Sequence, residues 1–139
     1  MGFAREIETQ LEAFAMGAHF AEASQRLVDI WTCDGLGLEA VEPILRFMEL
    51  HPDIDYGSPG ALVHFMERFY GQGYEEALLA SVARRPTEHT TWLLNRLING
   101  EQEPSAKGML VNAMHGIAAH PEADELTLRR AYHFLGLKA

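Results

Sequence analysis

The chain has 139 residues, of which 47% are hydrophobic, and a formal net charge of −9. This length suits a single domain over residues 1–139, and nothing in the composition suggests a disordered chain. The 20 acidic against 11 basic residues argue against a nucleic-acid or anionic-membrane partner, because both need Lys and Arg to replace counterions. The charge instead favours a basic partner, or serves solubility alone.

Helix-forming residues dominate, and no segment shows the alternation of a strand. We expect helices over residues 3–16, 18–32, 38–50, 59–70, 74–84, 88–98, 104–119 and 121–135. The second should bury Phe20, Leu27, Val28, Ile30 and Trp31. The third either begins near Glu42 or is kinked at Pro43.

Capping residues predict where the later helices begin. Ser58 and Pro59 are typical of a helix start, and Thr87 should cap the helix that follows Pro86. Pro121 resembles a first-turn proline. About eight helices with short connections are therefore expected.

Three prolines recur 34 and 35 residues apart, at Pro52, Pro86 and Pro121. Aligning them also aligns Met48, Val82 and Ile117, along with other apolar residues. Such a period is typical of helical repeats. The expected fold is all-α, a right-handed array of stacked α-hairpins of the HEAT or armadillo kind. Residues 1–35 fit the repeat least and could form an N-terminal cap.

No apolar stretch approaches the length of a membrane span, and the lone Cys33 can form no internal disulfide. The first residues include acids, Glu6 and Glu8, where a signal peptide would be basic. A cytoplasmic location is expected.

The helix over residues 88–98 has two faces of different character. Leu93, Leu94, Leu97 and Ile98 share one face, and His89, Trp92, Asn95, Arg96 and Asn99 share the other. A Trp among Arg and Asn has the composition of an interaction hot spot. The alternative is that a neighbouring helix covers Trp92.

No constellation indicates catalysis or a cofactor. His64 and Glu67 are three residues apart, a spacing that invites a zinc site, but a His-Glu-x-x-His motif and a Cys cluster are both missing. Serines lack a nucleophile elbow, and Gly57 to Gly60 is too short for a phosphate loop. We therefore expect a protein without enzymatic activity, metal or cofactor.

Between residues 49 and 76 the chain holds six acids and one base, Arg68. Asp53, Asp55 and Tyr56 lie in a turn-rich segment, and Glu67 and Tyr70 lie in the following helix. Acids interleaved with tyrosines can steer and anchor a basic partner. The alternative is an ordinary polar loop in which Tyr56 anchors the loop to the core.

Three segments carry a family resemblance: Asp-Ile-Asp-Tyr-Gly-Ser-Pro-Gly-Ala-Leu-Val-His-Phe from residue 53, Arg-Pro-Thr from 85, and Thr-Trp-Leu-Leu-Asn-Arg-Leu-Ile-Asn from 91. They resemble a family of small all-helical bacterial immunity proteins of contact-dependent inhibition and related polymorphic toxin systems. The resemblance implies a protein that binds the C-terminal domain of one cognate toxin and blocks its active site or substrate approach. Many such toxins are nucleases with basic surfaces.

The sequence thus leaves two functions open: toxin neutralisation, and a general helical-repeat adaptor that binds a peptide or helix in its groove. The expected binding surface consists of Asp53, Asp55, Tyr56, Glu67, Tyr70, Trp92, Asn95, Arg96 and Asn99.

Overall fold

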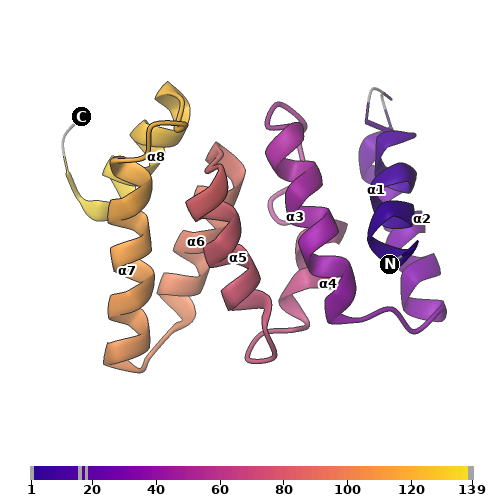
Figure 1. Ribbon diagram of the computed structural model, residues 1–139, viewed down its shortest axis with the longest axis horizontal. Coiled ribbons are helices and arrows are strands. Elements are labelled where there is room, and N and C mark those ends of the chain that lie inside the picture. The colour runs from indigo at the N-terminus through magenta and orange to yellow at the C-terminus, as the bar shows by residue number, and fades with distance from the viewer. Residues whose placement is uncertain (1, 16, 18, 138–139) are drawn as a thin grey trace. The chain divides into compact units, whose positions relative to one another are not determined.

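The computed structural model describes residues 2–15, 17 and 19–137, and this part of the chain is all-α, as predicted (Figure 1). Its helices are α1 (Gly2–Glu12), α2 (Phe20–Cys33), the 3-10 helix η1 (Leu38–Ala40), α3 (Val41–Leu50), α4 (Ala61–Glu67), α5 (Tyr74–Arg84), α6 (Glu88–Gly100), α7 (Pro104–Ala118) and α8 (Glu125–Leu135). Within the described residues, no helix combines the length and apolar character that crossing a bilayer requires.

The chain divides into two compact units, unit 1 (Met1–Ala77) and unit 2 (Leu78–Ala139). In unit 1, α1 packs on α3, α2 packs on α4, and η1 contacts α1 and α3. In unit 2, α6, α7 and α8 all contact one another. The boundary falls within α5. A single domain with residues 1–35 as its cap stays a prediction.

The core of unit 1 is built on aromatic side chains. The rings of Phe20 and Phe47 stack with centroids 5.8 Å apart, and Trp31 meets Phe65 edge-on at 5.8 Å. Burial of Phe20, Leu27 and Trp31 is as predicted, whereas Val28 is only half-buried. Ile30 is 48% exposed, so the prediction that α2 buries it is wrong. At 100° per residue, Ile30 lies one position before Trp31 and turns out of the buried stripe.

The core of unit 2 is aliphatic. Leu93, Leu94 and Leu97 are fully buried, as the predicted leucine face of α6 requires, whereas Ile98, the fourth residue of that face, is half-buried. Thr87 caps this helix as predicted: its Oγ1 accepts from the Thr90 amide at 3.1 Å, and Thr90 Oγ1 accepts from the Thr87 amide at 3.0 Å. Reciprocal capping of this kind fixes where a helix starts.

Two predicted helix starts are wrong. The helix expected after Ser58 begins only at Ala61. Gly60 occupies its N-cap position, and no side chain there forms a capping hydrogen bond. Ser58 and Pro59 instead lie in a turn, and a Cβ on the following Gly60 would collide with the Tyr56 carbonyl oxygen. Pro121 likewise lies in a turn ahead of α8.

The last helix begins later because Asp124 caps it. Its Oδ1 accepts from the Thr127 amide at 2.8 Å. In the third helix, by contrast, the alternative of a later start is confirmed. The α-helix begins at Val41, so Pro43 lies in its first turn, where its missing N–H costs nothing.

The recurring prolines share a structural position. Pro52, Pro86 and Pro121 each follow shortly after the end of a helix, namely α3, α5 and α7. The aligned residues Met48, Val82 and Ile117 are all buried. The stacked HEAT-like arrangement itself stays a prediction.

Candidate partner-binding surface

The acidity of the chain belongs to one unit. Residues 1–77 hold 14 acids and 4 Lys or Arg, a net charge of −10, whereas residues 78–139 hold 6 acids and 7 Lys or Arg, a net charge of +1. Unit 1 therefore presents the stronger electrostatic signal to a charged partner.

Within unit 1, the acidic segment between residues 49 and 76 is only partly accessible. Asp53, Asp55 and Glu76 are exposed, Glu67 and Glu75 are half-buried, and Glu49 is buried. Both carboxylate oxygens of Glu75 accept from the amide of Gly71, at 3.0 and 2.9 Å. The segment thus offers fewer free carboxylates than its composition suggests.

Tyr56 is a correction to the expected surface. It is only 6% exposed, its hydroxyl donates to the His51 carbonyl at 2.7 Å, and its ring meets Phe20 edge-on at 5.7 Å. Burial raises the pKa of Tyr56 above its ordinary value, and the nearby Glu12 charge adds to this. A ring held in the core cannot face a partner. Tyr56 instead anchors the loop that presents Asp53 and Asp55.

The other predicted residues of unit 1 lie at both ends of α4. The loop with Asp53 and Asp55 leads into its first residue, whereas Glu67 is its last residue and Tyr70 follows in the next turn. Seven helical residues span about 10 Å. Tyr70 is 41% exposed, so part of its ring can reach a partner.

A cavity of about 760 Å³ on unit 1 adds residues that sequence reasoning missed. It is lined by Glu6, Ile7, Gln10, Trp31, Asp34, Gly35, Leu36 and Glu39. The lining holds three carboxylates and no Lys or Arg. Trp31 Nε1 donates to Gln10 Oε1 at 2.8 Å, and Glu39 Oε1 accepts from the Gly37 amide at 2.6 Å.

The cavity combines negative charge with some apolar surface, of which half-buried Leu36 is the most accessible residue. A Lys or Arg side chain has the matching form, an aliphatic stem with a cationic head. The lining residues come from α1, α2, the following loop and η1, which are separated in sequence. No local motif could have revealed them, and the only available signal was the number of acids in the first 40 residues.

The predicted residues of α6 belong to unit 2. Trp92 is half-buried, the Arg96 guanidinium lies 5.1 Å from its ring centre, and the His89 ring lies 5.6 Å away. Asn95 is half-buried and Asn99 is exposed. A cation over an indole face is attractive, so Arg96 and Trp92 form a pre-assembled pair. The sequence left open whether this face is an exposed binding surface or is covered by a neighbouring helix. The structure shows a face that is partly covered and partly accessible.

His64 and Glu67, the pair considered for zinc binding, are not joined by further metal ligands among the described residues. His64 is exposed and Glu67 half-buried on α4. Across the described part of the chain, no group of three or more His, Cys, Asp or Glu side chains is placed to hold a metal ion.

Comparison with protein-family models, curated proteins and solved structures finds no match to this chain. The resemblance to immunity proteins stays a prediction.

Proposed function

We propose that this chain is an immunity protein that binds the C-terminal domain of one cognate toxin, of the basic nuclease type, and neutralises it. The observation that carries the proposal is the net charge of −10 on unit 1 against +1 on unit 2. The sequence resemblance points the same way. No cofactor or chemical step is needed, because the protein acts by covering the active site or substrate surface of the toxin.

An acidic unit suits this task for a physical reason. A nuclease must attract phosphates, so its substrate surface carries Lys and Arg. A protein surface dense in carboxylates competes for the same groups and is steered to them over long range. Steering is screened by salt, so association should slow as ionic strength rises.

The contacts proposed on unit 1 are of two kinds. Exposed Asp53 and Asp55 form a rim on the loop that Tyr56 anchors. The cavity lined by Glu6, Asp34 and Glu39 receives a Lys or Arg side chain of the toxin. The half-covered pair of Trp92 and Arg96 is a second predicted contact on unit 2.

The decisive experiment is co-purification with the C-terminal domain of a large secreted protein encoded beside this chain. We expect a one-to-one complex that abolishes the toxicity of that domain, with an association rate that falls between low salt and about 0.5 M salt. Complex formation without loss of toxicity, or weak and salt-insensitive binding to several partners, would favour the adaptor function instead.

Matched variants test whether unit 1 carries the recognition. Replacing Glu6, Asp34 and Glu39 by their amides removes three charges and keeps similar shapes. The dissociation constant should rise at least roughly tenfold at low salt, which corresponds to about 1.4 kcal/mol. The control replaces three acids of unit 2, Glu101, Glu122 and Glu125, by Gln. Equal losses of affinity in both variants would show that net charge alone matters and that the cavity is not a contact.

A further inference from the structure

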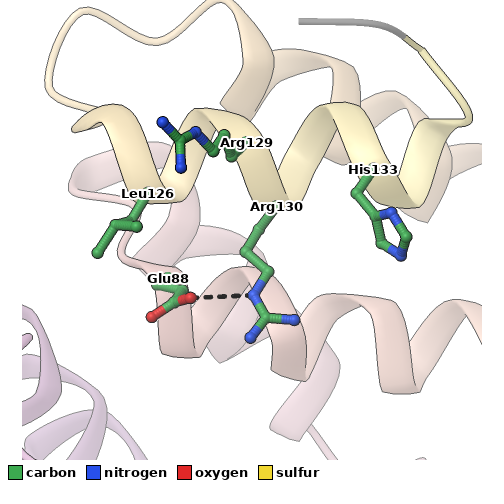
Figure 2. A pocket seen from close by; sticks show the side chains of 5 residues that line it. All are labelled: Glu88, Leu126, Arg129, Arg130 and His133. Atoms are coloured by element: carbon green, nitrogen blue, oxygen red, sulfur yellow. Dashed lines mark hydrogen bonds and ion pairs between the residues drawn. The ribbon is translucent and has the colours of Figure 1, made fainter.

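A second pocket lies between α6 and α8, within unit 2. Its volume is about 390 Å³, and Glu88, Leu126, Arg129, Arg130 and His133 line it. Figure 2 shows Leu126, Arg130 and His133 extending from α8 on the side of α6, where Glu88 stands at the helix start. The lining differs from that of the unit 1 cavity, because it holds two arginines and one carboxylate. Arg129 is paired with Glu125 at 2.8 Å, so Arg130 is the cation that the proposal concerns.

Arg130 is the central group of this pocket. Its Nε donates to Glu88 Oε2 at 3.0 Å, and this is its one hydrogen bond or ion pair to a described residue. A guanidinium carries five N–H donors, so both terminal nitrogens remain able to bind another acceptor. The two side chains are 46% and 40% exposed, so solvent screens the pair and it contributes little to stability.

We propose that this pocket binds a carboxylate, presented as a Glu or Asp side chain by a protein partner. The terminal nitrogens of Arg130 form a fork that matches two carboxylate oxygens. His133 also lines the pocket, and Leu126, 54% exposed, offers an apolar contact for the stem of the incoming side chain.

The neighbouring Glu88 favours a carboxylate over a phosphate. A phosphate carries up to two negative charges, so Glu88, already at 3.0 Å from Arg130 Nε, repels it more strongly than a singly charged carboxylate. Exposure of the lining favours a carboxylate that a protein partner holds in place, because small ligands bind tightly only where a site encloses most of their surface. A free blocked amino acid should therefore bind the same group, but weakly. The proposal concerns unit 2 alone and does not depend on what unit 1 binds.

The test is an NMR titration of the isotope-labelled full chain with blocked glutamate, N-acetyl-glutamate methylamide. Blocked glutamine serves as the uncharged control and inorganic phosphate as the competing anion, all at constant ionic strength. We expect blocked glutamate to shift backbone amides of α8 and the start of α6, with a dissociation constant in the millimolar range. Blocked glutamine should leave them in place.

Three variants make the result specific to the pocket. Arg130→Gln should abolish the shifts, whereas Arg85→Gln, which removes the same charge from an exposed position of unit 2 outside the pocket, should not. Glu88→Gln should tighten binding roughly two- to fivefold, because it removes the carboxylate that competes for Arg130. This variant tests the proposal even if Arg130→Gln fails to fold.

Several results would overturn the assignment. Phosphate that shifts the same amides at lower concentration than blocked glutamate would identify a phosphate site instead. Equal losses of the amide shifts in Arg130→Gln and Arg85→Gln would show that blocked glutamate responds to the net charge of the protein and not to this pocket. Weaker binding in Glu88→Gln, or no shifts with any probe, would exclude a carboxylate site.

Discussion

Unit 1 and unit 2 hold their helices together by different means. The buried aromatic residues of the described chain, Phe20, Trp31, Phe47, Tyr56, Phe65 and Tyr74, all belong to unit 1. The buried apolar residues of unit 2 are aliphatic or Met. Large rings bury much area for each residue and so supply a strong core from few positions.

The helix ends show the opposite distribution. In unit 2, Thr87, Glu103 and Asp124 each cap a helix through their side chains. In unit 1, the described N-cap residues of α2, η1, α3 and α4 make no side-chain cap bond.

This difference bears on where charge can be placed. A net charge of −10 on unit 1 repels itself and destabilises the compact state. An aromatic core offsets that repulsion without using surface residues, which leaves the surface free to be acidic. Unit 2 is nearly neutral and does not face this repulsion, and its aliphatic core is supplemented by side-chain caps at the starts of α6, α7 and α8.

The largest expected effect comes from the same substitution made in both units. Trp31→Ala removes a side chain that is 1% exposed, packs on Phe65 and donates to Gln10, so it should lower the free energy of unfolding by about 3–5 kcal/mol. Trp92→Ala removes a half-buried ring and should cost only about 1 kcal/mol. Urea denaturation followed by circular dichroism measures both. Equal costs would contradict the view that aromatic packing matters more to unit 1.

Removing a cap should affect unit 2 next most strongly. Thr87→Ala loses the reciprocal cap of α6 and should cost about 1–2 kcal/mol in urea denaturation. Thr87→Ser retains the hydroxyl and is the control. His19→Ala, at an N-cap of unit 1 without a cap bond, should change stability by less than about 0.5 kcal/mol. If His19→Ala lowers the free energy of unfolding as much as Thr87→Ala does, the helix starts of the two units do not differ in how much their N-cap residues stabilise them.

Local signals in the sequence predicted the all-α class and many of its elements. The bounds of α5 and the Thr87 cap of α6 follow directly from residues next to each other in the chain. The predicted starts near Ser58 and Pro121 are wrong because other nearby contacts compete with those residues. The backbone of Gly60 lies close to the Tyr56 carbonyl, and the Asp124 side chain caps α8 three residues after Pro121.

The candidate site was less accessible to sequence reasoning. The acidic segment was recognised, but its composition could not show that Glu49 and Tyr56 are buried. The carboxylates of the cavity meet only after α1, α2 and η1 pack together. Which side chains are buried, and which carboxylates come together, depends on tertiary contacts. Local sequence patterns do not reveal those contacts.

Tyr56 gives a smaller, pH-dependent effect in unit 1. Tyr56→Phe removes the hydrogen bond to the His51 carbonyl and should cost about 0.5–1.5 kcal/mol at neutral pH. Burial raises the pKa of Tyr56 above the ordinary 10.0, so the folded state keeps the proton longer than the unfolded state. This contribution is complete below pH 10.0 and is lost as the pH rises above that value.

The measurement is urea denaturation of both proteins at about pH 9 and about pH 11. The wild type should lose up to about 1.4 kcal/mol more than Tyr56→Phe over this range, because each pH unit above the unfolded pKa contributes that amount. Parallel losses in the two proteins would mean that Tyr56 ionises as easily in the folded chain as in the unfolded one.

The smallest effect concerns Asp124 in unit 2. The hydrogen bond from the Thr127 amide to the Asp124 carboxylate lowers the pKa of this group. Because the folded pKa is lowered, the stabilisation is present above the unfolded pKa and is lost as the pH falls through the folded value. Asp124→Asn keeps a capping oxygen without a titrating proton, so it should change stability by less than about 0.5 kcal/mol at neutral pH and weaken the loss in acid. Asp124→Ala, which removes the cap itself, should cost about 1 kcal/mol at every pH where the wild-type carboxylate is ionised. If the Asn and Ala variants are equally destabilised at neutral pH, the negative charge of Asp124 stabilises the start of α8 and its hydrogen bond to the Thr127 amide does not. In that case the helix ends of unit 2 are stabilised by charge and not by side-chain hydrogen bonds.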